Sequence, residues 1–150
     1  MSFKIPNLAW IAVCDGAKGI VFRNEGERGS LNLCTVSVMG AELRAAHEHG
    51  SDRPDRIVSP TGSGRHAVET VDRHRLAEIH FLEDFARSLD DMVPQHALQA
   101  TLIVIAPPRA LGILRRKLSA RLRQMLKREI ARDLTGHTVD QIETFLSIPD

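Results

Sequence analysis

The sequence has few aromatic residues and no long apolar run. Tyrosine is absent from its 150 residues, and one tryptophan and five phenylalanines make up the aromatic 4%. Hydrophobic residues still reach 43%, so we expect a core built from leucine, isoleucine, valine and alanine. The apolar run at 8–14 is much shorter than the roughly 20 residues of a membrane span, and no signal-peptide cleavage region follows it. We therefore expect a cytoplasmic protein without a membrane span.

Cysteine and the common site motifs are also scarce. Cys14 and Cys34 lie in apolar runs without CxxC spacing, which favours two buried free thiols over a disulfide. The histidines include an HxH pair, His47 and His49, but no HExxH or Cys/His zinc spacing, so they are interpreted as surface residues. No P-loop, dinucleotide fingerprint or nucleophile elbow occurs. The sequence thus predicts no metal and no cofactor.

The charges are unevenly placed, although the formal net charge is only +1. Sixteen of the 20 cations are arginine, whose planar guanidinium suits phosphate and carboxylate. Residues 109–128 hold eight cations and no acid, whereas 78–91 hold five acids and one arginine. Such a division indicates a basic surface in the second half of the chain.

The apolar pattern predicts strands, then helices, in a fixed order. Strands are expected at 8–14, 18–24 and 30–39, the first two forming a hairpin through Asp15-Gly16. A polar segment without periodicity, 40–68, is expected to be a long loop. A helix follows, capped by Thr70 and ended by Pro94, with one apolar face made of Leu76, Ile79, Leu82, Phe85, Leu89 and Met92.

The second half alternates strand and helix. A fully apolar strand at 100–106 stops at Pro107-Pro108, and the helix after it carries Leu111, Leu114 and Leu118 in a pattern that runs on to Leu126. The segment 127–135 extends that helix or forms an edge strand, and Gly136 ends either. Thr138 caps a last helix whose Ile142, Phe145 and Leu146 face inward.

The order of these elements predicts an α/β fold class. We expect a single three-layer domain over 1–150 with a mixed sheet of about five strands, three antiparallel and then parallel. Helices are expected on both faces of the sheet.

Asp15 ends the first strand, where a metal-dependent nuclease would keep a carboxylate. Such a site needs two or more carboxylates around Mg²⁺, and Asp133 and Asp140 are the possible partners. The adjacent Gly16 favours a plain turn aspartate.

The segment "SPTGSGRHAVE" is the first candidate site. Gly62 and Gly64 permit close approach to a partner, and Arg65 and His66 supply hydrogen-bond donors for phosphate. Arg73 and Arg75 follow at the start of the helix. Affinity for nucleic acid comes largely from cations that neutralise phosphates, so these arginines favour a nucleic-acid site. The alternative is a flexible surface loop whose glycines only permit a turn.

The stretch "RALGILRRKLSARLRQMLKR" is the second candidate site. Arg115, Arg116, Arg121 and Arg123 fall outside the apolar stripe and would form a basic ridge for nucleic acid or another acidic surface. The helix start at Pro108 is a further place for an anion. The alternative is an ordinary solvated helix face.

Four stretches together resemble the bacterial host attachment protein family over almost the whole chain: "NLAWIAVCDGAKGIVFRNEG", "HGSDRPDRIVSPTGSGRHAVE", "VIAPPRALGILRRKL" and "IARDLTGHTVDQIETFL". That family is described as required for attachment to host cells. It is in turn similar to the central domain of archaeo-eukaryotic peptide-chain release factors, which implies a ribonuclease H-like fold. In those factors a GGQ loop between the third strand and a long helix enters the ribosome. The resemblance places "GSGRH" at "GRGGQ", with Arg65 in place of the second glycine of the triplet and His66 in place of the glutamine.

The resemblance and the arginines together predict a non-catalytic binding module for the ribosome or structured RNA, with an indirect role in host attachment. One alternative is a protein-interaction factor acting directly with the host-attachment machinery. Another is a hydrolase of an RNA-linked ester, with His66 as the candidate catalytic residue positioning water and Arg65 on phosphate.

Overall fold

The computed structural model describes residues 4–27, 29–40, 64–96 and 100–148, with the backbone alone for 64–69. In chain order its elements are β1 (Trp10–Cys14), β2 (Lys18–Asn24), β3 (Leu33–Gly40), α2 (Gly64–Met92), β4 (Leu102–Ala106), α3 (Pro108–Lys117), α4 (Ala120–Met125), β5 (Leu126–Ala131) and α5 (Val139–Ser147).

The five strands form one mixed sheet in the order β3-β2-β1-β4-β5. The first three strands pair antiparallel, with Trp10 opposite Arg23 and Cys14 opposite Gly19 in the β1–β2 hairpin. β4 and β5 then add parallel to β1. The predicted α/β fold and mixed five-strand sheet are confirmed.

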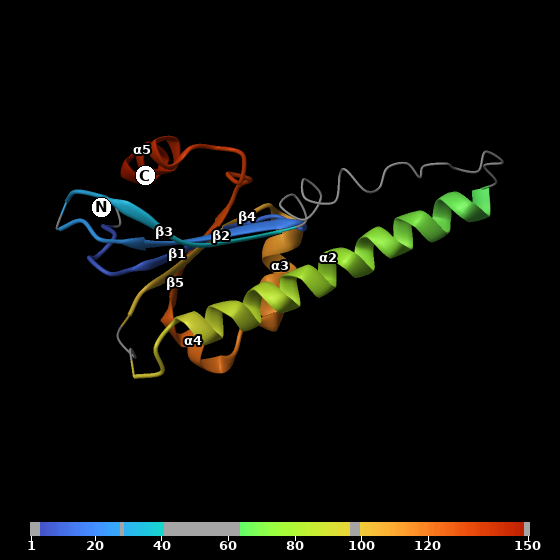
Figure 1. The fold of residues 1–150 in the computed structure, drawn as a ribbon, viewed down its shortest axis with the longest axis horizontal. Helices are drawn as coiled ribbons and strands as arrows, with labels where there is room; N and C mark the ends of the chain where they lie inside the picture. The colour runs from blue at the N-terminus through green and yellow to red at the C-terminus, as the bar shows by residue number, and fades with distance from the viewer. Residues whose placement is uncertain (1–3, 28, 41–63, 97–99, 149–150) are drawn as a thin grey trace.

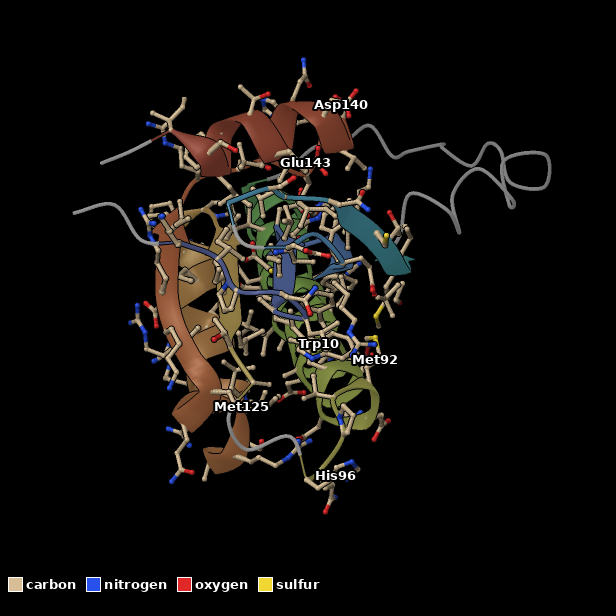
Figure 2. All side chains as sticks on the ribbon, turned by 90° about the vertical axis from the view of Figure 1, so that its left-hand side faces the viewer. Trp10, Met92, His96, Met125, Asp140 and Glu143 are labelled. Carbon is tan, nitrogen blue, oxygen red and sulfur yellow. The ribbon has the colours of Figure 1, made fainter. Side chains whose placement is uncertain are left out.

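Helices lie on both sides of this sheet (Figure 1). Alternate residues of β1 face opposite sides: Ala12 and Cys14 pack with α2, α3 and α4, whereas Ile11 and Val13 pack with α5. Figure 2 shows Met92 and Met125 on one side of the sheet and α5 on the other. The central strands β1 and β4 are covered on both faces, which explains why their sequences are unbroken apolar runs.

Helix α2 begins earlier than the sequence predicts. It starts at Gly64, so Thr70 lies inside the helix and is not its cap, and the predicted loop at 40–68 loses its last five residues. Residues 41–63 lie outside the described part of the chain. Leu76, expected on the apolar face, is 53% exposed, so burial of that face begins beyond it.

The predicted helix after Pro108 is two helices and a strand. α3 ends at Lys117, and Ser119 caps α4 by accepting a hydrogen bond from Leu122 N at 3.2 Å. The segment 127–135 was expected either to extend the helix or to form an edge strand. It contains most of the strand β5, which begins at Leu126 and ends at Ala131. Gly136 therefore does not end it. The predicted cap of the last helix is confirmed, because Thr138 and Gln141 form a reciprocal capping box.

The two cysteines differ in their surroundings. Cys14 is fully buried, but Cys34 is exposed on the edge strand β3, so the prediction of two buried thiols is wrong for Cys34. An edge strand lies beyond most of the helical cover, and an apolar sequence does not reveal that position. Both thiols are free.

Candidate nucleic-acid interface

The N-terminal half of α2 projects beyond the sheet and the other helices (Figure 1). Every residue from 70 to 77 is exposed, a run of more than two helical turns. The C-terminal half is anchored instead: Leu82, Phe85 and Leu89 are buried, and full burial of each such side chain contributes about 1.5–3 kcal/mol. We call residues 64–77 the α2 arm. Its exposed side chains are open to a partner.

The α2 arm holds most of the first predicted site. Arg73, His74 and Arg75 are exposed on it. Gly64, Arg65 and His66 were expected in a loop, but their backbone forms the first turn of α2. Gly62, His47 and His49 lie outside the described residues. The structure therefore replaces most of the predicted glycine-bearing tip with the end of a helix.

A cleft of about 620 Å³ lies at the base of the α2 arm. Three elements form it: the β1–β2 turn, the arm and the first turn of α3. Its lining includes Asp15, Gly16, Ala17, Val71, His74, Arg75, Glu78, Pro107, Arg109 and Ala110.

The cleft depends on one ion pair and one glycine. Arg109 Nε donates to Glu78 Oε1 at 2.8 Å, which joins α3 to α2. A Cβ at position 16 would overlap the Glu78 carboxylate, so glycine permits the close approach of the turn. Glu78 offsets Arg109 and Asp15 offsets Arg75, so the formal charges of the cleft lining balance.

The acidic stretch of α2 pairs with the basic stretch of α3 and α4. Lys117 Nζ lies 2.8 Å from Glu83, and Arg121 lies 2.8 Å from Asp90 and also donates to the carbonyl of Pro94 at 3.0 Å. The side chain of Arg121 is only 19% exposed. Of the predicted ridge, Arg121 is thus occupied by contacts that hold α4 to α2.

Arg115 also has a structural partner. Its guanidinium makes a bidentate pair with Glu129 of β5, with Nε donating to Oε2 at 3.0 Å. This bond lowers the pKa of Glu129, just as the bond from Lys117 lowers the pKa of Glu83. Both acids therefore stay ionised at neutral pH. Arg116 and Arg123 are exposed, and neither has an ion pair within the described part of the chain.

Two cations of the second predicted stretch that were not named as site residues join this surface. Lys127 and Arg128, on β5, line a groove of about 520 Å³ together with Arg115, Arg123, Leu126 and Glu129. The sequence could not assign the direction of these two side chains, because 127–135 was left as either helix or strand.

Asp15 serves the hairpin turn. Its Oδ1 accepts hydrogen bonds from Ala17 N at 2.8 Å and Lys18 N at 2.7 Å. The single hydroxyl hydrogen of Thr135 is shared between Asp15 Oδ2 at 3.2 Å and Asp133 Oδ1 at 2.8 Å, measured from Thr135 Oγ1. The turn interpretation is confirmed. Over 4–27, 29–40, 64–96 and 100–148, no three side chains are grouped as metal ligands.

Cys14 is not a reactive thiol. Burial, with the nearby charges of Asp15 and Asp133, raises its pKa to about 12. The thiolate is the nucleophilic form, so Cys14 is inert at neutral pH.

The fold and these surfaces define an α/β protein with a projecting helix and two basic regions. The chain belongs to the family described as "Protein required for attachment to host cells", whose model matches residues 10–146. It is also similar to a protein named "Uncharacterized protein RP470" from Rickettsia prowazekii (strain Madrid E), at 45% identity over 42 residues. That match spans 28% of each chain. Within the described residues, every helix is too short or too polar to cross a membrane.

Proposed function

We propose that this host attachment family protein is a cytoplasmic, non-catalytic module that binds the ribosome or structured RNA, and that it acts in host attachment indirectly. The observation that carries the proposal is the α2 arm. It presents Arg73 and Arg75 on a helical run, 70–77, whose residues are all exposed. Arginine on an exposed helix neutralises phosphates without displacing packed contacts.

The proposal extends to the fold. We infer that 1–150 form a single ribonuclease H-like domain similar to the central domain of peptide-chain release factors. Support comes from the element order: the long helix α2 follows the third antiparallel strand, and β4, α3, α4 and β5 come after α2. In this account the α2 arm with Gly62, Gly64, Arg65 and His66 corresponds to the part of a release factor that enters the ribosome.

Removing the two arginines of the α2 arm tests the proposal. In Arg73→Gln/Arg75→Gln, affinity for ribosomes or a hairpin RNA should fall, and the salt slope should flatten by about 1.5–2. Lys4→Gln/Arg87→Gln is the control, because it removes the same charge from exposed positions away from the arm. Equal binding by both variants would reject the arm as the RNA-binding element.

A second candidate is a protein-interaction factor acting directly in attachment, and one observation favours it. Val71 and Leu76 on the α2 arm are 48% and 53% exposed, and exposed apolar side chains on a helix can contact a protein partner. They are five residues apart, so they lie about 140° apart around the helix and would contact separate parts of that partner. Val71→Ser/Leu76→Ser separates the two functions. This variant should keep RNA binding and lose a protein partner.

A further inference from the structure

The groove between α4 and β5 is a second charged surface, separate from the α2 arm. Arg123 comes from the last turn of α4, and Leu126, Lys127 and Arg128 follow directly on β5. Arg115 reaches it from α3, opposite Glu129. Three elements that are consecutive in the chain therefore place four cations around one groove.

Within the described part of the chain, the charge that Arg123 and Lys127 bring to the groove is not offset. Glu129 is the one acid of the lining and is already engaged by Arg115. The acids of α2 do not compensate this charge, because Glu83 pairs with Lys117 and Asp90 with Arg121. Lys127 donates to the carbonyl of Gln124 at 3.3 Å, a contact that leaves its ammonium charged and exposed.

We propose that this groove binds the phosphate backbone of structured RNA, as a second contact besides the α2 arm. The inference rests on the proposed function and specifies the surface that docks the RNA. Charge complementarity favours a phosphate chain over a protein. The groove is open and five of its six lining residues are charged, whereas the centre of a protein interface is depleted of charged residues.

The two contacts are held at a fixed separation by α2. The bond from Arg121 to Asp90 fixes α4 near the C-terminal end of α2, whereas Arg75 lies 15 residues earlier. At 1.5 Å per residue, this is roughly 22 Å along the helix axis. A hairpin of about 12 base pairs, roughly 41 Å long at 3.4 Å per base pair and somewhat shorter in RNA, is longer than this separation.

The test compares Arg123→Gln/Lys127→Gln with the control Lys4→Gln/Arg87→Gln, which loses one arginine and one lysine elsewhere. Filter binding to the 12-base-pair hairpin would be measured from about 50 to 300 mM salt. We expect the groove variant to bind about tenfold more weakly at low salt, with its salt slope flattened by about 1.5–2, and the control to change less than twofold. Unchanged thermal unfolding would show that both variants are folded.

The outcomes separate the inference from the proposed function. If Arg73→Gln/Arg75→Gln weakens binding but the groove variant matches the control, the groove inference is wrong and the function stands. If the wild-type protein binds neither hairpin nor ribosome, the proposed function fails. Polyglutamate that perturbs the NMR signals of Arg123 and Lys127, where the hairpin does not, would overturn the inference in favour of an acidic protein partner.

Discussion

Arg109 Nε and Glu78 Oε1 lie 2.8 Å apart, and this bond joins the first turn of α3 to the place where α2 leaves the body of the protein. Glu78 is half-buried, whereas residues 70–77 before it are exposed. The pair therefore links α2 to α3 at the base of the α2 arm.

Breaking this pair should loosen the arm without unfolding the protein. Arg109→Ala removes a partly exposed ion pair worth about 0.2–1 kcal/mol, so the melting temperature should fall only slightly. Hydrogen exchange of amides 70–77 should become several-fold faster, because the base of the α2 arm loses its bond to α3. Arg87→Ala, which breaks the exposed pair with Asp84, is the control and should leave exchange in the arm unchanged.

Two glycine substitutions should change stability in opposite directions. A Cβ at Gly19 would overlap the ring of Phe85, which is buried, so Gly19→Ala should destabilise the protein by about 1–3 kcal/mol. Gly112 lies within α3 with open space at its Cβ position, so Gly112→Ala should stabilise it by about 0.5–1 kcal/mol. Urea unfolding measures both. Equal effects would contradict the close contact of α2 with β2.

The thiols should react in sequence. Cys34 is exposed and should be modified by a thiol reagent in the native protein at pH 8, whereas Cys14 is buried with its pKa raised to about 12. We expect one reactive thiol per native chain and two in denaturant. Cys34→Ser should abolish the native reaction, and fast labelling of that variant would show that Cys14 is accessible.

The Arg115–Glu129 pair predicts one part of the pH dependence. The guanidinium lowers the pKa of Glu129 below its usual 4.5, so its stabilisation is present above pH 4.5 and is lost as the pH falls through the folded-state pKa. The stability difference between wild type and Arg115→Ala should therefore be larger at pH 6 than at pH 3. A difference independent of pH would mean that Arg115 acts by packing alone.

Local sequence signals predicted much of the fold. Each correctly predicted feature depends only on residues close together in the sequence. These features are the apolar runs of β1 and β4, the turn at Asp15 and the cap at Thr138. The start of β5 at Leu126 was missed because a helical pattern of leucines continues to that residue. The early start of α2 was missed because Thr70 is a good cap by residue type, although tertiary context places it inside a helix.

The candidate site was less predictable, because ion pairs depend on which elements meet. The sequence shows that 78–91 is acidic and that 109–128 is basic. Only the packing of α2 against α3 and α4 reveals that Arg121 pairs with Asp90 while Arg123 remains exposed. The same packing brings Lys127 and Arg128 beside Arg123.

Ribosome co-sedimentation of the wild-type protein across a salt series tests the central claim most directly. If the protein binds ribosomal RNA through its arginines, the bound fraction should be high at about 50 mM salt and fall steeply by about 300 mM. The Arg73→Gln/Arg75→Gln variant should fall less steeply from a lower start. A wild-type protein that stays in the supernatant at low salt, or sediments equally at every salt concentration, would contradict the account.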